Sequence, residues 1–167
     1  MRERDQKARN DCSGSAEEQM KCYGKVAETV DKPNTKRINE IYNAGGFPTV
    51  KRVGRESVEA FYLLLQHSND LALKQKCLPG IKRAFRQKVI SANDYTNFTD
   101  RLLVNLGKPQ IYGGNFEMKD GKLVMSPTLD LKNLDKRRKS IGLPPIAEYV
   151  KMLKKAYKLD VVISSEN

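Results

Sequence analysis

The amino-acid sequence predicts a mainly α-helical fold: a single-domain helical bundle with one small β-hairpin at about residues 110–125. Apolar residues recur every three or four positions along most of the chain, which is the period of an amphipathic helix. This period gives way to alternation only around Asp120-Gly121, a dipeptide typical of two-residue hairpin turns. The length of 167 residues suits one domain of ordinary size.

The composition excludes several classes of protein. A single histidine excludes metal motifs with two or more imidazoles, and three cysteines exclude a four-cysteine zinc site. We therefore expect no metal and no cofactor. No apolar run approaches the roughly 18 residues of a membrane span, and residues 1–5 do not resemble the start of a signal peptide.

The cysteines do not decide between an oxidising and a reducing cellular compartment. Cys12 and Cys22 could pair in an oxidising compartment, but nothing in their spacing requires it, and Cys77 would remain odd. A cytoplasmic location is the expectation that the cysteines favour. A secreted or periplasmic location is the alternative if a leader has been removed.

The first third of the chain predicts two helices and a connector. Residues 1–14 are charged and weakly periodic, so we expect an arm or a frayed helix there. Met20 and Tyr23 fall on the apolar face of a helix that Lys32-Pro33 should end. Asn34 should cap the next helix, and an extended connector should follow over residues 47–54.

The middle of the chain predicts the centre of the bundle. A helix over about residues 55–69 is apolar on two sides, as expected of a central helix. Pro79 suits the first position of a new helix. Ser91 to Asp94 resembles a capping box, and the helix that it opens should end at Gly107.

The last third predicts the hairpin and two further helices. A short helix is expected over about residues 133–141, and a longer one should follow Pro144-Pro145. The sequence shows no internal repeat and no low-complexity linker. We therefore expect one domain over residues 15–160 and a C-terminal tail over residues 161–167.

His67 is the first candidate for chemistry. A histidine at the end of a buried helix can act as a general base, and Asp70, three residues later, could orient its ring. Gln66 is a polar neighbour that could bind a ligand. A histidine that satisfies main-chain carbonyls near a helix end is the structural alternative.

Three further segments could bind a ligand. Arg101 follows Asp100 in an apolar helix and could grip a carboxylate or phosphate, or form an internal ion pair. Gln110 and Tyr112 share one side of a predicted strand, where a bulge is an equally good interpretation. Arg137 and Arg138 lie in a basic run that could face an anion or simply be solvated.

An ordered set of short motifs runs through about residues 1–150. The set comprises Asp5-Gln6…Arg9, Gly46-x-Pro48…Val53-Gly54, Gln66-His67, Leu78-Pro79, Tyr95…Asp100-Arg101, Gln110-x-Tyr112-Gly113 and Arg137-Arg138…Gly142-Leu143. It resembles that of a bacterial family of small helical domains of unknown function. The family's strand motif reads Gln-x-Tyr-Gly-Thr-Gln, whereas Gly114 and Asn115 stand at the last two positions here. The resemblance implies a shared site but no particular reaction.

Polar residues on elements otherwise built for burial need partners. We therefore expect the helix of His67, the helix of Arg101 and the strand of Tyr112 to converge on one pocket. Our leading hypothesis is a pocket for a small anionic or polar ligand, with hydrolase or transferase chemistry that uses His67 as acid/base.

Two other hypotheses stay open. One is a protein-interaction module of inhibitor, immunity or secretion-associated type, whose basic helices contact an acidic partner. The other is nucleic-acid binding or cleavage through the basic C-terminal helices, suggested by the net charge of +11. Solvated lysine faces account for the same charge, so nucleic acid is not the favoured partner.

Overall fold

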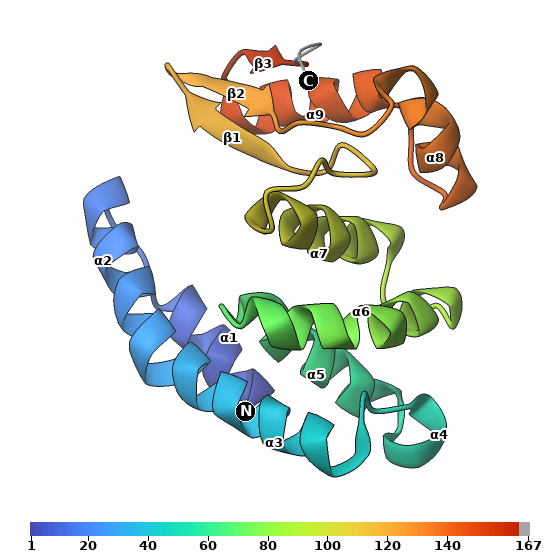
Figure 1. Cartoon of the computed structure of the whole chain (residues 1–167). Coiled ribbons are helices and arrows are strands. Elements are labelled where there is room, and N and C mark those ends of the chain that lie inside the picture. Colours follow the sequence, from blue (N-terminus) through green and yellow to red (C-terminus); the bar gives the residue numbers. More distant parts are fainter. Residues whose placement is uncertain (164–167) are drawn as a thin grey trace. The chain divides into compact units, whose positions relative to one another are not determined.

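The computed structural model describes residues 1–163 and confirms a mainly helical fold with a small sheet near the C-terminus (Figure 1). Its contacts group into two compact units, Met1–Val89 and Ile90–Asn167, which we describe separately. The expectation of one domain over residues 15–160 stays a prediction. Among residues 1–163, no helix has the length and apolar character needed to cross a membrane.

The first unit begins with a helical pair joined by a disulfide. α1 spans Arg2–Asn10, so the charged N-terminal segment is helical, and α2 spans Ala16–Val26. A disulfide joins Cys12 to Cys22 and packs beside the buried side chains of Val26 and Val30.

The predicted inner face of α2 was wrong. Met20 and Tyr23 are exposed, by 76% and 44%. The inner face instead carries Cys22 and Val26, because the disulfide and the small apolar cluster around it fix the rotation of the helix.

The helix that starts as α2 does not end at Pro33, contrary to the prediction. It continues through a π-helical turn, η1 (Ala27–Asp31), into α3 (Lys32–Gly45). Pro33 cannot donate to the carbonyl of Thr29 four residues earlier. Arg4 Nη2 donates to that oxygen at 3.0 Å, which satisfies it from outside the helix. Asn34 is consequently a buried interior residue of α3 and not a cap.

The rest of the first unit consists of α4 (Val50–Val53), α5 (Arg55–His67) and α6 (Leu71–Arg86). The expected extended connector over residues 47–54 thus contains a short helix. α5 is apolar on two sides as predicted, and it contacts α1, α3, α4 and α6. Pro79 lies inside α6 and does not start a helix, because Asp70 already caps that helix one turn after α5 ends.

The second unit starts with α7 (Ala92–Asn105), whose Ser91–Asp94 capping box is confirmed. Strands β1 (Phe116–Lys119) and β2 (Lys122–Met125) form the predicted hairpin. Asp120 and Gly121 both have positive φ, of 49° and 71°, which is the backbone that a two-residue turn of this type needs. Residues 110–115, expected within the hairpin, form a loop apart from one isolated bridge at Gln110.

The C-terminal part of the second unit completes the sheet. η2 (Leu131–Asn133), α8 (Leu134–Ser140) and α9 (Ile146–Tyr157) follow the hairpin, close to where the sequence predicted two helices. β3 (Val161–Val162) then pairs in parallel with β2, within the segment expected to be a tail. Residues 164–167 of that tail lie outside the described residues.

Two helical glycines give a matched test of packing in the first unit. A Cβ at Gly80 of α6 would overlap the ring of Phe47, whereas a Cβ at Gly24 of α2 would meet no atom within 4 Å. We expect Gly80→Ala to lower the free energy of unfolding by about 1–3 kcal/mol through overpacking. Gly24→Ala should raise it by about 0.5–1 kcal/mol through helix propensity. Urea unfolding of both variants tests the pair, and equal effects would contradict this packing.

Candidate functional site

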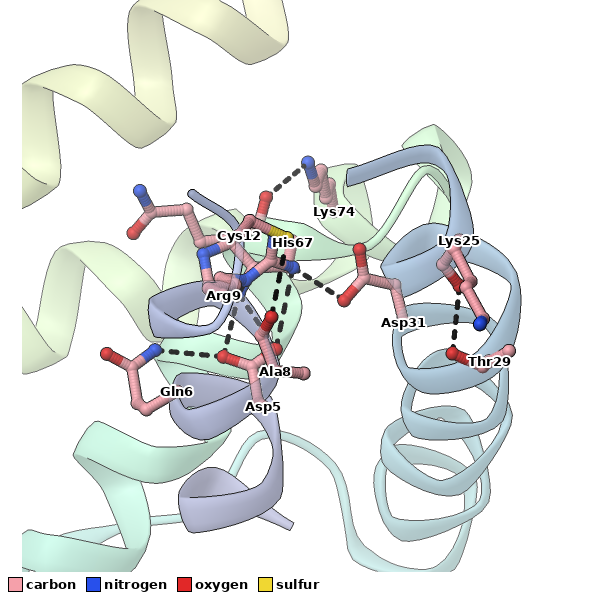
Figure 2. A network of polar contacts seen from close by, with 11 residues as sticks. Asp5, Gln6, Ala8, Arg9, Cys12, Lys25, Thr29, Asp31, His67 and Lys74 are labelled. Carbon is pink, nitrogen blue, oxygen red and sulfur yellow. Dashed lines mark hydrogen bonds and ion pairs between the residues drawn. The ribbon is translucent and has the colours of Figure 1, made fainter. Parts of the chain in front are cut away.

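Three charged side chains of the first unit converge around His67. Figure 2 shows Asp5 and Arg9 of α1, Asp31 of η1 and His67 of α5 directed toward one another. His67 Nδ1 lies 3.1 Å from both carboxylate oxygens of Asp5. Arg9 Nε lies 3.1 Å from the same Nδ1. We call these four residues the His67 cluster.

Local structure explains how each member reaches the cluster. Asp5 and Arg9 are four residues apart on α1 and therefore share one helix face. Asp31 closes the π-helical turn, and His67 is the last residue of α5, where the chain leaves the helix at Ser68. α1 contacts both η1 and α5, which brings three segments far apart in the sequence together.

The cluster is a largely buried network of charge. The Asp5 side chain is fully buried, and that of His67 is 20% exposed. Arg9 Nη2 donates to Asp31 Oδ1 at 2.6 Å and, at 3.5 Å, to Asp5 Oδ1. Gln6 Nε2 donates to the other Asp5 oxygen at 2.9 Å. The carboxylates of Asp5 and Asp31 thus share the guanidinium of Arg9, and the imidazole of His67 is a further partner of Asp5.

The same atoms raise the question of a metal. One ligand atom each from Asp5, Asp31 and His67 lies within 4.8 Å of the others. Arg9, however, has nitrogen atoms within 3.5 Å of an atom of each of the three residues and places its own positive charge among them. A metal ion would have to displace that guanidinium, so the donor set does not fit a metal as it stands.

A small cleft of about 240 Å³ adjoins the cluster. Asp31 belongs to both, and the cleft is also lined by Asn69 and Asp70, which follow His67 directly in the chain. Its remaining lining residues are Ala27, Glu28, Lys32 and Thr35. A larger groove of about 720 Å³ is mostly apolar and shares no residue with the cluster.

The predicted neighbours of His67 have other partners. Asp70 Oδ1 accepts from the main-chain N–H of Leu73 at 2.8 Å and thereby caps α6. The structure pairs the His67 ring with Asp5, not with Asp70. The carbonyl of Gln66 accepts from Lys74 Nζ at 3.0 Å.

In the second unit, the predicted Gln-x-Tyr-Gly segment wraps around a buried carboxylate. The main-chain N–H groups of Ile111, Tyr112 and Gly114 all donate to Asp100, at 2.8–3.2 Å. Gln110 closes the loop, since its Nε2 donates to two carbonyls and its Oε1 accepts from the N–H of Asn115. We call this segment, residues 110–115, the Asp100 loop.

Two arginines donate to main-chain carbonyls of the Asp100 loop. Arg138 is buried and donates to the carbonyls of Tyr112 and Pro144, both at 2.7 Å. Arg137 Nε donates to the carbonyl of Ile111 at 2.9 Å, and its Nη atoms donate to two further carbonyls. The two guanidinium groups of the basic run at 136–139 therefore both bind main-chain carbonyls elsewhere in the second unit. Arg101, by contrast, is exposed on α7.

Burial sets the electrostatics of this second unit. It raises the pKa of Asp100, against the hydrogen bonds from the loop N–H groups, which lower it. It also raises the pKa of Tyr112 to about 12, and Tyr95 adds to that shift. Burial lowers the pKa of Arg138, while Tyr149, whose ring lies 5.1 Å from the guanidinium carbon, raises it.

Comparison with known families agrees with the motif resemblance. A family of unknown function, DUF6624, matches residues 1–162. The chain belongs to this family. The DUF6624 match includes the His67 cluster and the Asp100 loop, and it assigns a reaction to neither. No curated protein and no solved structure matches the chain.

Sequence reasoning found His67 but missed its partners. Asp5 and Arg9 stood in the motif set that resembles that of a family of unknown function, which was the one signal that could have singled them out. Nothing in the sequence marked Asp31. The structure places His67 in the first unit and Arg101, Gln110, Tyr112, Arg137 and Arg138 in the second.

Because Asp100 holds the Asp100 loop and Arg101 is exposed, we expect substitutions at these two adjacent residues of α7 to differ greatly in their effect on stability. Asp100→Asn should lower the free energy of unfolding by about 2–3 kcal/mol, because buried N–H donors lose an acceptor. Arg101→Ala should change it by no more than about 0.5 kcal/mol, as expected for an exposed residue. Urea unfolding of both variants is the measurement. A small effect of Asp100→Asn would show that the loop does not depend on this carboxylate.

Proposed function

We propose that this chain is a hydrolase or transferase that uses His67 as its acid/base on a small polar ligand. The single observation that carries the proposal is the contact of His67 Nδ1 with both oxygens of buried Asp5, at 3.1 Å. A carboxylate in this position orients an imidazole and selects its tautomer, as in hydrolases of the Ser-His-Asp type. Asp5 takes the orienting role that the sequence suggested for Asp70.

The two neighbours of Nδ1, Asp5 and Arg9, determine which ring nitrogen of His67 carries the proton. Nδ1 can donate to Asp5 or accept from Arg9 Nε, but it cannot do both. An unprotonated Nδ1 would direct its lone pair at a fully buried carboxylate, which has no water to compensate. Arg9 keeps its bonds to Asp31 and Asp5 in either case. We therefore assign the proton to Nδ1.

This tautomer leaves Nε2 as the base. Among the described residues, the hydrogen-bond partners of His67 all lie on Nδ1, and the side chain is partly exposed. Nε2 can then take a proton from a water or hydroxyl nucleophile and return it to the leaving group. The cleft that shares Asp31 with the cluster is our candidate site for the ligand.

The other predicted site residues divide into two groups. Arg101 is exposed and stays our candidate for an anion clamp, and Gln66 stays a candidate polar contact. The hydrogen bonds of Gln110, Arg137 and Arg138 to main-chain groups support a positioning role in the second unit. Tyr112 is half-buried beside Tyr95 and stays a predicted ligand contact.

Hydrolysis of p-nitrophenyl acetate and p-nitrophenyl phosphate tests the proposal with an ester and a phosphate monoester. We expect turnover of at least one probe, lowered at least about 100-fold by His67→Gln and by Asp5→Asn, because general acid–base catalysis contributes about 10²–10⁴-fold. Asp11→Asn, the same change at an exposed position just after α1, is the matched control and should leave the rate unchanged.

Circular dichroism would confirm that each variant is folded. Folded His67→Gln and Asp5→Asn variants with wild-type rates would contradict the proposal. Turnover of neither probe by the wild-type protein would contradict its hydrolase form.

A further inference from the structure

α1 supplies two members of the His67 cluster, yet it has little apolar surface with which to pack. Its nine residues, RERDQKARN, contain one apolar side chain, Ala8. Helices shorter than about 12 residues are marginal on their own, and most helices in proteins are held by an apolar face. α1 must therefore be held mainly by its polar contacts and by covalent attachment.

The Cys12–Cys22 disulfide provides that attachment. Cys12 lies two residues after the end of α1, and its Cα is 5.6 Å from that of Cys22 in α2. α2 runs without a break into η1, which carries Asp31. The bond thus ties the segment that carries Asp5 and Arg9 to the segment that carries Asp31, across a loop of only ten residues.

We propose that this disulfide is a redox switch for the His67 cluster. In the oxidised chain α1 is held against η1 and α5, and Asp5 reaches His67. A dithiol reductant breaks the Cys12–Cys22 bond through a mixed disulfide: two electrons pass to the two cysteines, which become thiols, and the reductant becomes a disulfide. α1 then loses its tether, and His67 loses Asp5 and Arg9.

The switch concerns the assembly of the cluster and holds whatever reaction His67 performs. It also bears on location, because intramolecular disulfides persist in oxidising compartments such as the periplasm or the cell exterior. The assembled cluster therefore belongs to such a compartment, and the reduced cytoplasmic form is the disassembled one.

The single histidine makes the switch directly measurable. A ¹H–¹³C correlation spectrum gives the Cδ2–H and Cε1–H signals of one imidazole, which should move when excess dithiothreitol is added and return on reoxidation. Amide hydrogen exchange of residues 2–10 should become at least about tenfold faster in the reduced protein. The double variant Cys12→Ser/Cys22→Ser should show the reduced behaviour without reductant.

Cys77→Ala is the control. Cys77 is a buried free thiol whose pKa is raised by burial to about 12, so this variant should respond to reductant as the wild-type protein does. Thiol titration establishes each redox state. Unchanged imidazole signals and unchanged exchange in protein with three free thiols would overturn the proposal. Three free thiols in the air-oxidised protein would overturn it as well.

Discussion

The buried carboxylate of Asp5 constrains how the first unit is arranged. A charged group without access to water must be paired and hydrogen-bonded, and removing one partner of such a pair costs about 3–5 kcal/mol. Asp5 meets this requirement through Gln6 and Arg9 of its own helix and through His67 of α5. His67 lies 62 residues away from Asp5 in the sequence. The orientation of the imidazole follows from that pairing, and the docking of α1 depends on it together with the Cys12–Cys22 disulfide.

A buried carboxylate organises the second unit as well, but with different partners. Asp100 accepts from three main-chain N–H groups, which fold the Asp100 loop around it. A main-chain amide has no pKa near neutral pH and does not act as a general acid or base, so these hydrogen bonds stabilise the loop. Asp5 faces an imidazole, whose ordinary pKa of about 6.5 allows that role. The nature of the partner is therefore the basis on which we propose a structural role for Asp100 and an acid–base role for the pair of Asp5 and His67.

Local signals in the sequence predicted local structure well. The Asp120-Gly121 turn, the Ser91–Asp94 capping box and the apolar central helix are set by neighbouring residues and are confirmed. The predictions of helix boundaries at Pro33 and Pro79 were wrong, since both prolines lie within helices. At Pro33 a distant residue compensates for the missing N–H, because Arg4 donates to the carbonyl that Pro33 leaves free. The sequence could not predict the partner of His67 either. Asp70 was the nearest carboxylate in sequence, but it caps α6, and Asp5 lies 62 residues away.

We propose that Asp5 holds a proton on Nδ1 of His67 and leaves Nε2 as the base. A ¹⁵N NMR spectrum of the neutral imidazole tests it directly, because protonated and unprotonated ring nitrogens have well-separated shifts. We expect a protonated Nδ1 and an unprotonated Nε2. A protonated Nε2, with Nδ1 accepting from Arg9, would contradict it.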